Sequence, residues 1–173
     1  MKKSKRDWIL LIIFLVLAVL INVYIIYHAC LNGAASSEAS QGVVEVSEDV
    51  VNTVKPGTIT EANHDEFATF IRKAFGHFGL FVISGVFTSL TTYFAIKDTK
   101  WYKMGIGIGI SFLFGFLLAM TTEIIQLNVP GRSGEFIDVL IDTSGYVLGL
   151  GIIVLILFLV IRHQKKKPAN VAK

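Results

Sequence analysis

The chain has 173 residues, of which 53% are hydrophobic and only 17% are charged, and its formal net charge is +3. Soluble domains of average composition carry about 25% charged residues, so this composition argues against a soluble globular protein. The single cysteine, Cys30, excludes an internal disulfide framework and a metal site built from several cysteines. We therefore expect an all-α membrane protein of one domain.

Four apolar runs are long enough to cross a hydrocarbon core about 30 Å thick, which takes about 20 residues of helix. They predict transmembrane helices over residues 8–28, 76–96, 104–127 and 136–161. The first run follows the basic residues of segment 1–7, as in a signal peptide, but the apolar part of a signal peptide has only about 7–15 residues. We therefore expect the first run to be retained as a transmembrane helix.

The segment between the first two runs, residues 29–75, divides into two parts. Residues 31–60 are rich in Ser, Ala, Val, Glu and Gly and show no helical apolar stripe, which predicts a flexible or weakly strand-like acidic loop. Over residues 63–75 apolar side chains recur with the i, i+3, i+4, i+7 rhythm of an amphipathic helix. Asn63 and Glu66 resemble a capping box at its start. We expect this helix to lie on the outer surface of the cell membrane and to lead into the second span.

The lysines and arginines predict the orientation of the chain. Twelve of the sixteen lie in segments 1–7, 97–103 and 162–173. Basic residues concentrate in the cytoplasmic segments of membrane proteins. We therefore expect a multi-pass protein of the bacterial cell membrane with its N-terminus and C-terminus in the cytoplasm. The loop 97–103 would then be cytoplasmic, and the turn 128–135 extracellular.

Small residues four positions apart mark one face in each of the last two runs. The glycines that we expect to serve helix packing are Gly105, Gly109, Gly115, Gly145 and Gly149. Small residues at this spacing let membrane helices approach closely. They would also permit a homodimer.

Polar side chains cluster near the outer ends of the last two runs. Glu123 and Gln126 are three residues apart and Asp138 and Asp142 four apart, so each pair shares one helix face. The turn between the runs makes them antiparallel, and Arg132 on that turn can bind a carboxylate through two N–H groups. An ionisable residue deep in a membrane costs on the order of 2.5–3.5 kcal/mol and normally pairs or marks a functional site.

Lys73 and His77 share a helix face at the start of the second span, at the same depth as this cluster. We therefore expect one polar cavity lined by Lys73, His77, Glu123, Gln126, Arg132, Asp138 and Asp142. A structural alternative stays open, in which Arg132 and an acid only lock the hairpin and His77 is an interfacial histidine. No serine–histidine arrangement or metal triad supports a particular reaction, so the catalytic residues stay unassigned, and we expect no metal and no cofactor.

Two spacings of polar residues resemble the pattern of the VanZ-like family of small bacterial membrane proteins. They are Lys73-x3-His77-Phe78, and Glu123-x2-Gln126-x5-Arg132-x5-Asp138 followed by a glycine-rich run. The resemblance covers about residues 65–160, while the first run and the acidic loop align only by layout. Glu135 stands where the family pattern more often has aspartate. Asp142 stands where asparagine is usual, which adds a buried acid.

The resemblance implies a role in antibiotic resistance, because the name-giving member is associated with low-level resistance to the glycopeptide teicoplanin. We expect a cell-envelope protein that affects glycopeptide susceptibility by binding at the outward-facing polar cluster. Its partners would be membrane lipids, a lipid-linked cell-wall precursor, the glycopeptide or another membrane protein, and not a nucleic acid. An enzyme that acts on a lipid headgroup and a small lipid or solute transporter stay open as alternatives.

Overall fold

The computed structural model describes residues 3–96 and 101–166, and all regular structure in these ranges is helical. The elements are α1 (Lys5–Cys30), α2 (Gly33–Val54), α3 (His64–Ile71), the π-helix η1 (Arg72–Gly79), α4 (Leu80–Ile96), α5 (Trp101–Gln126) and α6 (Phe136–Lys166). The predicted all-α fold is confirmed. Residues 97–100 of the predicted loop 97–103 and residues 167–173 of the predicted tail lie outside the described ranges, as do residues 1–2.

Four helical segments in the described ranges are long and apolar enough to cross a membrane. They are Lys5–Cys30, His64–Ile96, Gly105–Gln126 and Phe136–Val160. Each contains most of one predicted run, and the second is longer than expected because α3, η1 and α4 follow one another without a break. Large apolar side chains along these helices point outward, as lipid-facing residues do. The chain is a multi-pass membrane protein.

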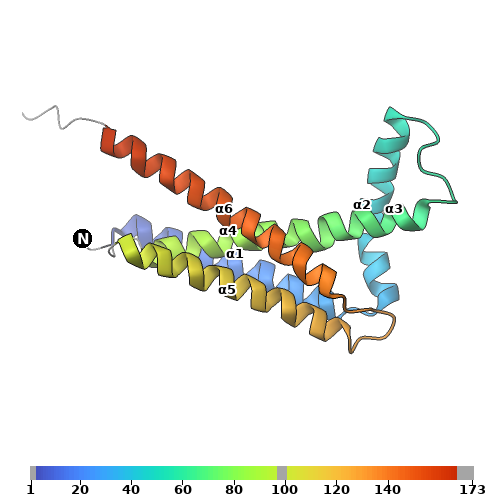
Figure 1. The fold of residues 1–173 in the computed structure, drawn as a ribbon, viewed down its shortest axis with the longest axis horizontal. Coiled ribbons are helices and arrows are strands. Elements are labelled where there is room, and N and C mark those ends of the chain that lie inside the picture. Colours follow the sequence, from blue (N-terminus) through green and yellow to red (C-terminus); the bar gives the residue numbers. More distant parts are fainter. Residues whose placement is uncertain (1–2, 97–100, 167–173) are drawn as a thin grey trace, which may run out of the picture.

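In Figure 1, α1, α4 and α5 run side by side along the length of the molecule, and α6 crosses them at an angle. Helix α4 contacts α1, α5 and α6, so it holds the bundle together. Added Cβ atoms at Gly145 and Gly149 of α6 would collide with the carbonyl oxygens of Phe78 and Val82. These two glycines therefore let α6 approach the second span backbone to backbone, as predicted.

The remaining predicted packing glycines differ from one another. Gly115 of α5 leaves room for the ring of Tyr146, which is completely buried. The prediction is wrong for Gly105 and Gly109, where an added Cβ would meet no atom within 4 Å. Both are exposed, because their face of α5 is covered by no described neighbour. A further close approach, which the spacing did not indicate, lies at Gly85 of α4, against the carbonyl oxygen of Tyr146.

The predicted loop over residues 31–60 is wrong, because most of it forms the 22-residue helix α2. Asn32 caps this helix by accepting a hydrogen bond from the amide of Ala35 at 2.9 Å. The only buried residue of α2 is Val44, which packs against Ala68 and Ile71 of α3. The other contacts of α2 include those of its polar residues Ser36 and Ser40, so the apolar periodicity did not reveal the helix. Helix α2 crosses one end of the bundle (Figure 1).

The predicted amphipathic helix over residues 63–75 is present in part. It begins as α3 but changes at Arg72 into the π-helix η1, which continues into α4. Ile71 is buried as expected, whereas Phe70 and Phe75 are 66% and 57% exposed.

The predicted capping box at the start of α3 is wrong. The Asn63 side chain makes no capping hydrogen bond with α3. Its Oδ1 atom instead accepts a hydrogen bond from the amide of Thr60 at 2.7 Å, and its Nδ2 atom donates to the carbonyl oxygen of Thr58 at 2.9 Å. Asn63 therefore stabilises the turn before α3 rather than the helix itself.

Candidate functional site

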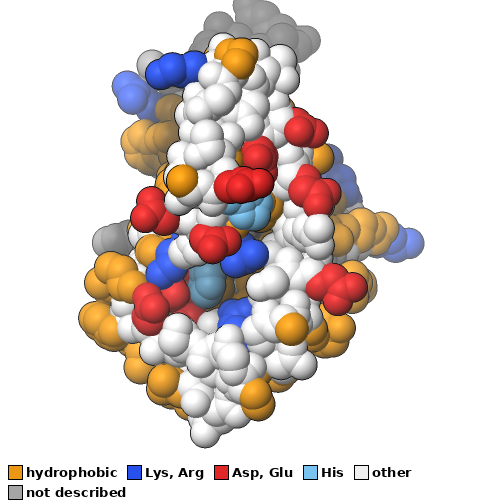
Figure 2. Space-filling model, turned by 90° about the vertical axis from the view of Figure 1, so that its right-hand side faces the viewer, with side chains coloured by type: hydrophobic (Ala, Val, Ile, Leu, Met, Phe, Trp, Pro, Cys, Tyr) orange, Lys and Arg blue, Asp and Glu red, His pale blue; other side chains and the backbone are white. Residues whose placement is uncertain are grey.

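The predicted site residues meet at the end of the bundle where α5 turns into α6, which we call the polar end. Helix η1 supplies two of them, α5 two, α6 two and the α5–α6 turn one. They are Lys73, His77, Glu123, Gln126, Asp138, Asp142 and Arg132. Figure 2 looks onto this end and shows acidic, basic and histidine side chains gathered around a hollow. The acidic residues and Gln126 lie on the two spans that the sequence predicted, whereas Lys73 and His77 lie on η1, which it did not predict.

The π-helix η1 places two of these residues opposite α6. In a π-helix each amide bonds to a carbonyl five residues earlier, and such turns occur frequently at functional sites. Lys73 and His77 both lie in η1, and both contact side chains of α6. The change of helix type thus coincides with the segment that faces the acidic residues of the last span.

Lys73 makes ion pairs with the carboxylates of Asp138 and Glu135, close to the α5–α6 turn. Its Nζ atom lies 2.6 Å from Oδ1 of Asp138 and 3.1 Å from Oε2 of Glu135. Asp138 is buried, so the ammonium group balances a carboxylate that has little access to water. Glu135 was not among the predicted site residues, although the family pattern contains an acid there.

His77 lies between two deeper carboxylates. Its Nδ1 atom is 3.1 Å from Oδ1 of Asp142 and 3.9 Å from Oε1 of Glu123. Glu123 is held by Gln126, whose Nε2 atom donates to Oε1 at 3.2 Å, and by the amide of Glu135, which donates to Oε2 at 3.0 Å. Asp142 is completely buried, and its Oδ2 atom has no hydrogen-bond partner among the described residues. The inner group therefore has two carboxylates and one imidazole.

The predicted contact of Arg132 with a carboxylate is wrong. Arg132 forms no ion pair within 4.0 Å in the described part of the chain, and its Nη1 atom instead donates to Oγ of Ser36 in α2. Arg72 of η1 behaves similarly, since its Nε atom donates to Oγ of Ser40 at 3.1 Å. Helix α2, which the sequence did not reveal, supplies both acceptors.

The charges around Arg132 oppose one another. Burial lowers the pKa of Arg132 below its ordinary value, and the positive charge of Arg72 lowers it further, while Glu123 and Asp138 raise it. An arginine stays protonated in proteins at neutral pH, so the polar end holds two guanidinium groups that repel each other. An anion between them would relieve this repulsion.

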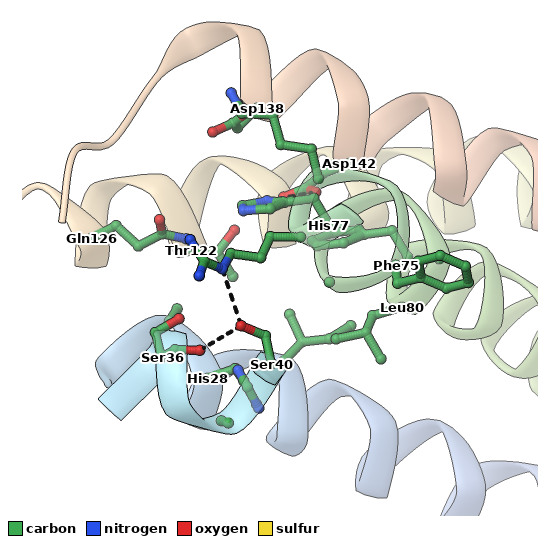
Figure 3. A pocket seen from close by; sticks show the side chains of 18 of the residues that line it. His28, Ser36, Ser40, Phe75, His77, Leu80, Thr122, Gln126, Asp138 and Asp142 are labelled. Atoms are coloured by element: carbon green, nitrogen blue, oxygen red, sulfur yellow. Dashed lines mark hydrogen bonds and ion pairs between the residues drawn. The ribbon is translucent and has the colours of Figure 1, made fainter. Parts of the chain in front are cut away.

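A cavity of about 580 Å³ opens among α1, α2, η1, α4 and the facing ends of α5 and α6. This volume lies in the range of small-molecule sites, about 300–1,000 Å³. Six of the seven predicted residues line it, and Glu123 does not. Figure 3 shows the His77 ring beside Asp142, with Ser36 and Ser40 of α2 across the cavity.

Sequence reasoning missed several polar residues of this cavity, namely His28, Ser36, Ser40, Arg72 and Glu135. Ser36 and Ser40 are four residues apart, which puts them on one face of a helix. The spacing had no such meaning while the segment was predicted to be a loop. Apolar residues including Phe75, Leu80 and Ile83 complete the lining. The cavity therefore offers charged groups on one part of its wall and apolar side chains on another.

Comparison with known proteins assigns the chain to a family. The family model described as VanZ/LLP1 matches residues 9–158. This match confirms the resemblance seen in the polar motifs and extends it toward the N-terminus, so that it includes most of α1 and all of α2. No curated protein and no solved structure matches the chain. The match covers most of the sequence, and the chain therefore belongs to the VanZ/LLP1 family.

Proposed function

We propose that the polar end faces the outside of the bacterial membrane and that its cavity binds the phosphate-bearing headgroup of an envelope lipid or a lipid-linked cell-wall precursor. This binding would alter susceptibility to teicoplanin-type glycopeptides. The observation that carries the proposal is a pair of guanidinium groups, those of Arg72 and Arg132, that line one cavity without a carboxylate partner within 4.0 Å among the described residues.

The two arginines favour a phosphate over other ligands. Each donates to a neutral serine hydroxyl, so its charge is available to an anion. The planar guanidinium group binds phosphate oxygens through two parallel N–H groups. Burial and, after it, the charge of Arg72 lower the pKa of Arg132, and a phosphate near both arginines would offset the second of these effects.

The apolar part of the cavity wall favours a lipid over a free ion. Phe75 and Ile83 line the cavity and are 57% and 43% exposed, and Leu80 lies beside them. A lipid presents a charged headgroup and an apolar chain together, and this lining offers surface for both. An inorganic anion would leave the apolar wall unused.

The distribution of basic residues supports the outward orientation. Twelve of the sixteen lysines and arginines lie in segments 1–7, 97–103 and 162–173, none of which contains the α5–α6 turn. By the positive-inside rule these segments lie in the cytoplasm, which puts the polar end outside. A site on that side is accessible to extracellular lipid headgroups and to glycopeptides.

The susceptibility of bacterial cells tests this function. A sensitive host that produces the chain is expected to tolerate more teicoplanin than a host with an empty vector. Arg72→Gln and Arg132→Gln should each return susceptibility to the vector level, because each removes one half of the anion site. Arg162→Gln, an exposed arginine of α6 far from the polar end, is the matched control and should keep the effect.

Two results would reject the proposed role. One is a wild-type chain that leaves teicoplanin susceptibility unchanged although it is present in the membrane. The other is an Arg132→Gln variant that protects cells as well as the wild type at equal membrane abundance. Immunoblots of membrane fractions supply the abundance comparison.

A further inference from the structure

We infer that His77, Glu123 and Asp142 bind one first-row divalent cation, such as Zn²⁺ or Mn²⁺, beside the cavity. This site is separate from the proposed anion site of the two arginines and does not depend on it. One ligand atom from each of the three residues lies within 4.8 Å of the others. No thiolate takes part, so the chemistry is that of an imidazole and two carboxylates.

The distances fit a metal centre with little movement. The Nδ1 atom of His77 lies 3.1 Å from Oδ1 of Asp142 and 3.9 Å from Oε1 of Glu123. With metal–ligand bonds of about 2.0–2.2 Å, neighbouring ligand atoms lie about 3–3.5 Å apart. A small approach of the Glu123 carboxylate would therefore complete three positions around one ion.

The group formed by His77, Glu123 and Asp142 has more acidic than basic side chains. Lys73 is engaged by Asp138 and Glu135, and no other lysine or arginine contacts the inner carboxylates within 4.0 Å in the described ranges. Two buried carboxylates thus share one imidazole, and when both are ionised a net negative charge remains even if His77 is protonated. Buried charge without a partner is costly, and a divalent cation would balance it.

The carboxylate of Asp142 points independently to a missing ligand. This residue is completely buried, and its Oδ2 atom has no hydrogen-bond partner among the described residues. Buried polar atoms in proteins nearly always have a partner, and an acceptor without one is destabilising. Coordination through either oxygen, or both, would supply an interaction for this carboxylate.

The surroundings of Glu123 resemble those of a metal-bound carboxylate. The amide of Glu135 donates to Oε2 at 3.0 Å, and Nε2 of Gln126 donates to Oε1 at 3.2 Å. Such hydrogen bonds orient the ligands of metal sites. His77 and Asp142 also line the cavity, so coordination positions that the protein leaves open would face it.

The ligand set indicates the class of metal. Mg²⁺ and Ca²⁺ favour sites made of oxygen ligands alone, and Cu⁺ favours sulfur, whereas Zn²⁺, Mn²⁺ and Fe²⁺ accept imidazole together with carboxylate. The sequence predicted no metal because the three ligands come from η1, α5 and α6 and follow no local spacing motif.

Titration calorimetry on the full chain in detergent micelles tests this site. After treatment with a chelator and its removal, the wild type is expected to bind one Zn²⁺ or Mn²⁺ per chain. Asp142→Asn, Glu123→Gln and His77→Gln should each weaken binding at least about ten-fold, as loss of a ligand does at other metal sites. The three variants are compared only where circular dichroism shows wild-type helix content, so Glu123→Gln or His77→Gln keeps the test decisive if Asp142→Asn does not fold.

A second histidine–carboxylate pair provides the matched control. Oε2 of Glu48 lies 3.5 Å from Nε2 of His64 near the far end of α2, so Glu48→Gln removes a comparable acid outside the site. The Glu48→Gln variant should bind the metal with the same affinity as the wild type. A wild type that binds neither Zn²⁺ nor Mn²⁺, or a folded Glu123→Gln variant with wild-type affinity, would overturn the inference.

The metal test is separable from the headgroup test. Arg132→Gln leaves all three proposed ligands in place, so it should bind the metal like the wild type even where it loses the effect on teicoplanin. Loss of metal binding in Arg132→Gln would contradict the separation of the two sites. If the wild type binds the metal but every variant has the same teicoplanin susceptibility as the wild type, only the headgroup proposal is rejected.

Discussion

Lys73 is the residue on which the charge balance near the α5–α6 turn depends. Replacing it in Lys73→Met leaves Asp138, which is 5% exposed, without its cation. Breaking a fully buried ion pair costs about 3–5 kcal/mol, and we expect about 1–3 kcal/mol here because the Lys73 side chain is 30% exposed. Chemical unfolding in detergent measures this loss.

The partner substitution distinguishes a charge effect from a packing effect. Asp138→Asn removes the stranded carboxylate, so the double variant Lys73→Met/Asp138→Asn should lose less stability than the sum of the two single variants. Additive losses would show that the ion pair contributes nothing of its own. A Lys73→Met variant as stable as the wild type would contradict the burial argument.

The spacing of polar residues predicted much of the site, but not the contacts that its arginines make. Glu123 with Gln126, and Asp138 with Asp142, follow helical spacing inside apolar runs, so their shared faces were visible in the sequence. The partners of Arg132 were not, because Ser36 reaches it across 96 residues from a segment that the sequence predicted as a loop. Long-range contacts of this kind depend on how helices pack, which local spacing does not encode.

At the scale of elements, the close contact of α4 with α6 depends on small residues at defined positions. An added Cβ at Gly149 would collide with the carbonyl oxygen of Val82, whereas one at Gly151 meets no atom within 4 Å. We therefore expect Gly149→Ala to lower the free energy of unfolding by about 1–3 kcal/mol, the usual cost of overpacking. Gly151→Ala, in the same helix, should be neutral or slightly stabilising, since alanine favours helix.

Thermal unfolding of both glycine variants in the same detergent is the measurement. Equal melting temperatures for Gly149→Ala and Gly151→Ala would contradict a backbone contact between α4 and α6. The comparison is well matched because the two substitutions add the same methyl group two residues apart in one helix.

The long helices were predictable from the sequence because lipid demands apolar side chains along their full length. Helix α2 was not, since it touches the rest of the protein mainly through Val44 and through the serines that face Arg72 and Arg132. The π-helix η1 was also invisible, because an amphipathic pattern does not distinguish an i→i+4 from an i→i+5 hydrogen bond. Both elements lie at the polar end, where the requirement for an apolar surface is relaxed.

At the scale of the whole molecule, the orientation in the membrane decides what the cavity can meet. In a Cys30→Ser background, Asn128→Cys in the α5–α6 turn is expected to react with a membrane-impermeant maleimide in intact cells. His163→Cys, exposed near the other end of α6, should react only after the membrane is opened. The reverse pattern would place the polar end in the cytoplasm and contradict the proposed function.

The central claim is that the cavity at the polar end holds a phosphate-bearing lipid, and native mass spectrometry of the detergent-purified chain tests it most directly. The wild type and Arg162→Gln are expected to carry a co-purified lipid, whose mass distinguishes a phospholipid from a lipid-linked precursor. The Arg72→Gln/Arg132→Gln variant should carry at least ten-fold less of it, because both guanidinium groups of the anion site are lost. A wild type without bound phosphate-bearing lipid, or a double variant that retains as much as the wild type, would contradict the account.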